Sequence, residues 1–117
     1  IVNMDYIQDA EIVDNILVYH NEDIIISFNI DTKELKTNSN FPTKIRSIYK
    51  DKSSSNIYII CEGSNLFILK EGGENIERVK NVQVNKNENV SKIFSNTNEL
   101  FYSTVAQSQW NIMNKKN

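Results

Sequence analysis

The sequence predicts an all-β protein made of short antiparallel strands, and three observations lead to this prediction. β-branched and aromatic residues cluster in short runs that polar segments separate, as in strands joined by turns. Outside the C-terminal end, no apolar run has the i, i+3, i+4, i+7 spacing of an amphipathic helix. The strand pattern also recurs at intervals of about 40 residues, which indicates repeated β units.

Eight runs carry the strand signal. In chain order they are ILVY at 16–19, IIISFNI at 24–30, KIRSIY at 44–49, NIYII at 56–60, NLFIL at 65–69, VQV at 82–84, KIF at 92–94 and LFY at 100–102. The segments IIISF and IYIIC are apolar at nearly every position, which favours strands that are covered on both faces. Cys61, the one cysteine, ends the second of these segments and is expected to be a buried thiol in a reducing compartment.

Aligning the sequence with itself shows the repeat. Residues 16–20 match residues 57–61 about 41 positions later, and these match residues 100–104 about 43 positions further on. A period of about 40 to 45 residues with four short antiparallel strands is typical of a β-propeller blade. We therefore expect about 2.5 blades of a larger propeller. Within one β domain or segment spanning residues 1–117, the approximate repeat units are 4–43, 44–89 and, as a partial unit, 90–117.

One short segment adds a family resemblance. Phe28-Asn29-Ile30-Asp31-Thr32 stands where WD repeats carry a Trp-Asp pair and a turn that ends in Thr-Gly. Together with the strand rhythm, this makes residues 10–113 similar to the WD-repeat family of β-propellers. The resemblance implies an intracellular, cytoplasmic or nuclear, scaffold that binds other proteins without catalysis. Because closed propellers have roughly four to eight blades, it also implies partner blades from a longer chain or from a partner subunit. Four loops would share one face of such a fold, near residues 21–23, 38–42, 62–65 and 84–89.

An alternative fold is a small barrel with a C-terminal helix, which resembles the pleckstrin-homology class. Val105, Ala106, Trp110 and Met113 fall at spacings that a helix could gather on one face, with Trp110 as the core anchor. Such a module would bind a peptide or a phosphoinositide headgroup. Its anion contacts would be four cations that alternate with apolar residues, namely Lys44, Arg46, Lys50 and Lys52. A second alternative is a fragment of an enzyme whose catalytic residues lie elsewhere.

Two short segments carry side chains that could form a chemical site, but both are expected to be loops. Residues 20–23, His-Asn-Glu-Asp, offer an imidazole and two carboxylates, but a lone histidine without a second ligand cluster favours a solvated hairpin loop. Residues 71–74, Glu-Gly-Gly-Glu, are glycine-rich but acidic, whereas a phosphate-binding loop needs a lysine and a following helix. We therefore expect no catalytic residues, no cofactor and no bound metal.

The charge and hydropathy of the chain narrow the possible partners. Thirteen Lys and Arg residues stand against 15 Asp and Glu residues, and no basic stripe of the kind that binds nucleic acid is present. No run of about 20 apolar residues occurs, so we expect no membrane insertion. The chain begins with Ile1 and carries no export signal, which indicates a processed or excised segment of a soluble protein.

Overall fold

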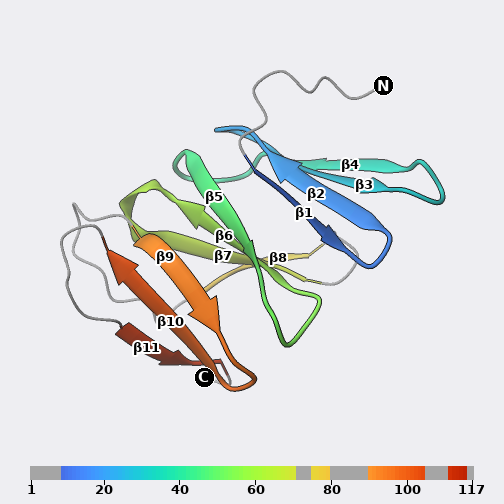
Figure 1. Ribbon diagram of the computed structural model, residues 1–117. Helices are drawn as coiled ribbons and strands as arrows, with labels where there is room; N and C mark the ends of the chain where they lie inside the picture. The colour runs from blue at the N-terminus through green and yellow to red at the C-terminus, as the bar shows by residue number, and fades with distance from the viewer. Residues whose placement is uncertain (1–8, 71–74, 80–89, 105–110, 116–117) are drawn as a thin grey trace.

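The chain forms three antiparallel sheets in a computed structural model that describes residues 9–70, 75–79, 90–104 and 111–115. In each sheet, neighbouring strands are consecutive in the sequence (Figure 1). The first sheet consists of β1 (Asp9–Val13), β2 (Ile16–His20), β3 (Ile25–Asn29) and β4 (Leu35–Asn38). The second consists of β5 (Ile45–Lys50), β6 (Ile57–Cys61), β7 (Asn65–Leu69) and β8 (Ile76–Arg78), with the 3₁₀ turn η1 (Glu62–Ser64) between β6 and β7. The third consists of β9 (Val90–Ser95), β10 (Glu99–Thr104) and β11 (Asn111–Asn114).

The predicted all-β class is confirmed for the described residues, which contain strands and one short 3₁₀ turn. Seven of the eight predicted runs lie on strands, and the eighth, at 82–84, lies outside the described residues. The runs did not include β1, β4, β8 and β11. β4 and β8 have the sequences LKTN and IER, so pairing with the neighbouring strand and not apolar composition places them in the sheets.

The helix over residues 105–113, which the alternative barrel fold requires, is wrong where it can be compared with the structure. Residues 111–114 form β11, which pairs antiparallel with β10 from Asn111 opposite Tyr102 to Asn114 opposite Glu99. Residues 105–110 lie outside the described part of the chain. The backbone groups of residues 111–114 are therefore paired across a sheet rather than within a helix, and the barrel with a terminal helix loses its main support.

The three runs with matching sequences occupy the same place in their sheets. Residues 16–20, 57–61 and 100–104 lie in β2, β6 and β10, each the second strand of its sheet in chain order. Between β2 and β6 the side chains do not follow the same alignment. Val18 belongs to the cluster between the first two sheets, and Ile59, 41 positions later, points back into that same cluster.

A shift of one residue along a strand reverses the face to which a side chain points. The turns that follow these strands differ in length by one residue, because residues 21–24 join β2 to β3, whereas residues 62–64 join β6 to β7. The 41-residue offset therefore matches β2 with β6 correctly in strand order. It pairs residues that point to opposite faces of their sheets, because the true alignment of the faces differs by one residue.

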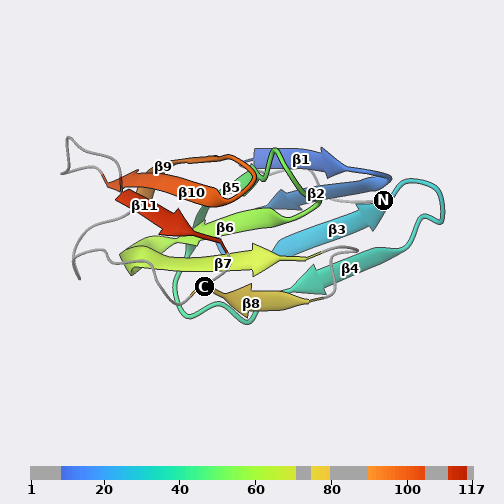
Figure 2. The same cartoon turned by 90° about the horizontal axis from the view of Figure 1, so that it is seen from below.

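The second sheet lies between the other two and carries both hydrophobic clusters (Figures 1 and 2). β6 is buried at all five positions. Ile57, Ile59 and Cys61 belong to the cluster with the first sheet, whereas Tyr58 and Ile60 belong to the cluster with the third. Successive side chains of a strand point to opposite faces, so this one strand contributes to both cores.

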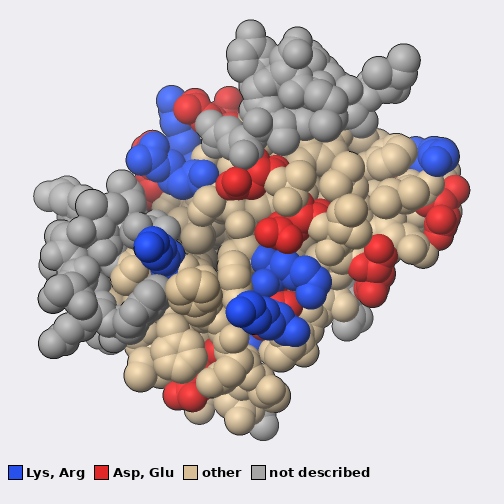
Figure 3. Space-filling model, in the orientation of Figure 1, with Lys and Arg blue, Asp and Glu red and all other residues tan. Residues whose placement is uncertain are grey.

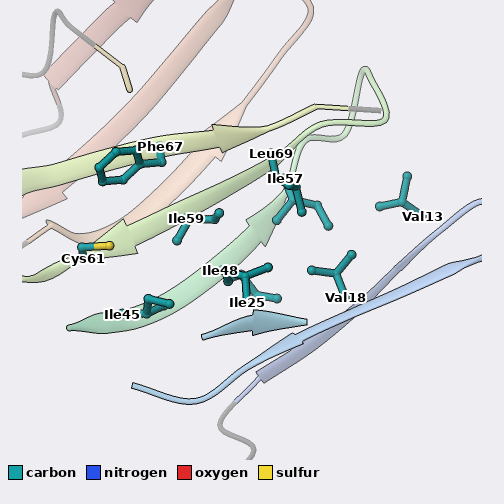
Figure 4. Close-up of a cluster of buried hydrophobic side chains, with 10 residues drawn as sticks. All are labelled: Val13, Val18, Ile25, Ile45, Ile48, Ile57, Ile59, Cys61, Phe67 and Leu69. Carbon is teal, nitrogen blue, oxygen red and sulfur yellow. The ribbon is translucent and has the colours of Figure 1, made fainter. Parts of the chain in front are cut away.

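The cluster between the first and second sheets is shown in Figure 4. Ile45 and Ile48 of β5 both belong to it, although they are three positions apart. The pairing of β5 with β6 shifts register between Ile45 and Ser47, and this irregularity brings the two isoleucines to the same face. Burial raises the pKa of the Cys61 thiol in this cluster to about 12.

The turn between β3 and β4 carries the segment that resembles a WD repeat. The Asn29 side chain accepts hydrogen bonds from the backbone N–H groups of Asp31 and Thr32, both at 3.0 Å. Lys33 follows with a φ of 66°, in the left-handed region that favours glycine. Its ammonium group donates to the carbonyl oxygen of Ile30 at 2.8 Å.

The search for membrane-spanning helices, made over the described residues, found no helix of sufficient length and hydropathy.

Candidate functional site

Three loops meet at one edge of the stack, where the first and second sheets adjoin. The loop between β2 and β3 contacts the start of β5, because the Ile45 N–H donates to the carbonyl oxygen of Glu22 at 2.7 Å. The turn after β6 contacts the same segment, because the Glu62 N–H donates to the carbonyl oxygen of Lys44 at 2.9 Å. The Thr43 hydroxyl also donates to the carbonyl oxygen of Glu62 at 2.7 Å. These contacts bring together loops 21–23 and 62–65 and the residues just after 38–42, whereas 84–89 lies outside the described residues.

An open cleft of about 320 Å³ lies between these loops. We name it the loop cleft; its lining residues are Asp9, Glu22, Lys44, Ile45, Arg46 and Glu62. Side chains of both charge signs line it. Lys44 pairs with Glu22 at 3.3 Å, and Arg46 pairs with Glu62 at 3.3 Å.

All four side chains of these two ion pairs are exposed by 40% or more. Exposed pairs of this kind contribute about 0–1 kcal/mol each, so a charged partner can replace either member at little cost. The loop cleft can therefore offer both cations and carboxylates to an incoming segment. On the face shown in Figure 3, Lys and Arg side chains likewise lie next to Asp and Glu side chains in several places.

His20 stabilises the first-sheet side of the loop cleft. Its side chain is fully buried, with Nδ1 2.8 Å from the carbonyl oxygen of Asn21 and Nε2 3.2 Å from Oδ2 of Asp9. A carbonyl oxygen can only accept, so Nδ1 carries a proton and donates to Asn21. The imidazole thus joins the end of β2 to the following loop and lies against Asp9 of β1. Within the described residues, no three His, Cys, Asp or Glu side chains are grouped so that they could hold a metal ion.

The four predicted cations lie in different surroundings. Lys44 and Arg46 line the loop cleft, each beside its own carboxylate. Lys50 donates instead to the carbonyl oxygen of Asp51 at 3.3 Å. Lys52 lies over the ring of Phe94, 5.9 Å from its centroid, in the third sheet. Two of the four cations therefore share a site, and that site also contains three carboxylates.

A buried ionic network that the sequence did not reveal joins the second sheet to the third. Asp51 is 1% exposed, and the ammonium group of Lys115 donates to both its carboxylate oxygens, at 2.9 and 2.7 Å. The Ser95 hydroxyl donates to the same carboxylate at 2.7 Å. Burial alone would raise the pKa of Asp51, but the hydrogen bonds from Lys115, Ser95, Ser53 and Ser54 outweigh it and lower the pKa to about 2.

The Asp51 network stabilises the arrangement of the sheets and does not line the loop cleft. Asp51 lies within the segment DKSSSN, which has the composition of a polar turn. Its main partner is 64 positions away in the sequence. Only the fold brings the two residues together, and no local pattern in the sequence indicates the pair.

Comparisons with protein-family models, with curated proteins and with solved structures found no match for this chain.

Proposed function

We propose that this chain is a non-catalytic interaction scaffold of the propeller type, in which each sheet is one blade. The observation that carries this proposal is the second sheet, which is covered on both faces by sheets with the same sequential strand order. A blade in a repeat architecture can bury its two apolar faces only against its neighbours. The stacking of three consecutive sheets follows this requirement.

The partner proposed for the scaffold is another protein, which binds through charged side chains in the loop cleft. Rigid strands hold the cleft, because Asp9 and Arg46 lie in β1 and β5, and backbone hydrogen bonds hold Glu22, Lys44 and Glu62 in place. Loops positioned by a rigid scaffold are common binding sites. We place the scaffold inside the cell, because its one cysteine is a buried free thiol.

The experiment places a photo-crosslinking amino acid at Lys44 of the chain, expressed in the cells that naturally produce it. A matched variant carries the same amino acid at Glu77, which lies in β8 and pairs with Lys70 away from the loop cleft. We expect discrete protein adducts from position 44 and none from position 77. Reversing the neighbouring charges with Arg46→Glu and Glu62→Lys should change or abolish these adducts.

Equal adducts from both positions, or none from position 44, would contradict the proposal. Adducts that survive reversal of both charges would show that the loop cleft does not select the partner by charge.

A further inference from the structure

The two contacts of the buried His20 imidazole require two protons. Nδ1 lies 2.8 Å from the carbonyl oxygen of Asn21, and Nε2 lies 3.2 Å from Oδ2 of Asp9. Both oxygen atoms accept hydrogen bonds when the Asp9 carboxyl group is ionised. A neutral imidazole carries one N–H group, so it can donate to one of these oxygens and turns a lone pair toward the other. The second contact therefore needs a further proton, on Nε2 or on the Asp9 carboxyl group.

The Asn21 carbonyl group is the more firmly held of the two partners. The Asn21 N–H donates to the carbonyl oxygen of Ile24 at 3.2 Å. The Asn21 side-chain oxygen accepts from the N–H groups of Asp23 and Ile24 at 2.8 and 2.9 Å. The Asp9 side chain, by contrast, is 45% exposed and lines the loop cleft, whereas the His20 side chain is fully buried. If the further proton leaves, the contact that breaks is therefore the one to Asp9.

Loss of this proton changes the charge that the loop cleft presents. Nε2 and the ionised carboxylate are then two acceptors that face each other, so the Asp9 side chain turns away from His20 and into the cleft that it lines. The other charged residues of the lining form two ion pairs, each of which balances its own charge. Without the proton, the Asp9 carboxylate therefore gives the lining one uncompensated negative charge, which the proton compensates while it is bound.

We propose that the proton shared by His20 and Asp9 is a pH-sensitive switch of the loop cleft. With the proton, Asp9 is held against His20 and the cleft is balanced in charge. When the proton passes to water, Asp9 enters the cleft, which then favours a cationic segment of the partner over an anionic one. Histidine ordinarily changes its charge between about pH 5 and 8, so the switch operates near physiological pH. The inference rests on the proposed function, since it gives the binding site of the scaffold a regulator.

Other titratable and charged side chains lie on the elements packed around this pair. They are Glu11 on β1, Glu22 and Asp23 after β2, Lys36 on β4, Lys44 and Arg46 at the start of β5, and Cys61 and Glu62 at the end of β6. Carboxylates, lysines and arginines ordinarily keep their charge between about pH 5 and 8. Burial raises the pKa of the Cys61 thiol to about 12, so this thiol stays protonated. A charge change at the cleft in this range is therefore assigned to the pair of His20 and Asp9.

The experiment follows the imidazole of the full chain by nitrogen NMR, where His20 is the one histidine and needs no further assignment. We expect both ring nitrogens to carry protons at about pH 5 and Nδ1 alone to carry one at about pH 8. The backbone N–H signals of Ile45 and Glu62, whose hydrogen bonds hold the cleft, should move with the same midpoint. Asp9→Asn supplies an amide N–H donor to Nε2, so it should keep His20 neutral and abolish this shared titration. The matched control, Glu11→Gln, removes a carboxylate two positions along β1 that does not line the cleft, and it should titrate as the unmodified chain does.

Two small probes of opposite charge test what the switch does to binding. Acetyl-arginine amide and acetyl-glutamate amide are titrated separately into the full chain, and the Ile45 and Glu62 signals report the dissociation constants. The arginine probe should bind about threefold more tightly at about pH 8 than at about pH 5, the effect of one exposed charge, and the glutamate probe should show the reverse. In Asp9→Asn neither dissociation constant should depend on pH.

Three results would each overturn the inference. They are an imidazole that carries one proton throughout, a titration of the ring that leaves the cleft signals unmoved, and an affinity for the arginine probe that does not rise with pH. None of them would change the cross-linking expected at Lys44, which is measured at a single pH. Conversely, a lack of adducts at Lys44 would leave the titration of His20 and the probe affinities as expected. Failure of the switch can therefore be distinguished from failure of the proposed function.

Discussion

The carboxylate of Asp51, in the turn between β5 and β6 of the second sheet, lies 2.7 Å from the ammonium group of Lys115, which directly follows the last strand of the third sheet. Both side chains are largely buried, with exposed fractions of 2% and 14%. The pair therefore joins two sheets that also contact each other through an apolar cluster and through hydrogen bonds to Ser95 and Asn96. Two predictions follow from this contact.

Removing the charge of Asp51 should destabilise the chain strongly. Asp51→Asn leaves the Lys115 ammonium group buried without its counter-ion, and breaking a buried pair in this way costs about 3–5 kcal/mol. Urea unfolding would measure the loss. The matched control, Glu77→Gln, breaks an exposed pair with Lys70 and should cost about 0–1 kcal/mol. Similar losses of unfolding free energy from the two variants would show that the buried Asp51 pair stabilises the chain no more than an exposed pair does.

The same contact should make stability depend on pH in acid. Folding lowers the pKa of Asp51 from 3.8 to about 2, so its contribution is present above about pH 4 and is lost as the pH falls through 2. The expected loss is about 2 kcal/mol, from roughly 1.4 kcal/mol for each unit of pKa. Urea unfolding at several pH values would measure it. The difference in stability between the unmodified chain and Asp51→Asn should shrink over this range, and a constant difference would contradict the assignment.

β6 should be sensitive to substitution on both of its faces. Ile59 and Ile60 are 0% and 3% exposed and belong to different hydrophobic clusters. Replacing either with Ala removes buried methyl groups and should cost about 2–5 kcal/mol. Ile30→Ala, at a position that is 40% exposed, should cost less than about 1 kcal/mol. Thermal unfolding would compare the three variants, and tolerance at either β6 position would show that this face is loosely packed.

Lys33→Gly should stabilise the turn between β3 and β4. The φ of 66° at Lys33 costs a residue with a side chain about 1 kcal/mol, which glycine avoids. Loss of the exposed hydrogen bond from Lys33 to Ile30 offsets part of the gain. The opposite change, Gly63→Ala, places a side chain at a φ of 74° and should destabilise. The nearest atom to the added Cβ would be 3.8 Å away, so this cost comes from the backbone and not from a clash. Urea midpoints that do not move in opposite directions would contradict this account.

Much of the fold could be predicted from local residue patterns. The uniformly apolar run around Ile59 predicts a strand covered on both faces, and β6 is buried at every position. The edge strands β4 and β8 could not be predicted in this way, because backbone pairing places polar residues such as Lys36 and Glu77 in them. The direction in which each side chain of the matched strands points could not be predicted either, because turn lengths decide which residues point inward.

The candidate site was predicted only in part. Lys44 and Arg46 are two of the four anion contacts predicted for the alternative barrel fold; both line the loop cleft, and their contact with an anion stays a prediction. Their carboxylate partners, Glu22 and Glu62, lie 22 and 16 positions away in the sequence, so only the folded chain shows that the cleft carries both charges. The pairing of Asp51 with Lys115 could not be predicted for the same reason, because the two residues are 64 positions apart in the sequence.

The position of Cys61 makes its thiol a probe of the boundary between the first and second sheets. The thiol is fully buried where the first two sheets meet, and its raised pKa keeps it protonated and unreactive. A thiol-specific reagent can reach it only while those sheets are apart. The rate of labelling therefore measures how often the two sheets separate. No cysteine lies where the second and third sheets meet, since the chain contains only one. The reagent therefore reports on one boundary alone, and comparing its rate with global unfolding would reveal whether the stack opens one sheet at a time.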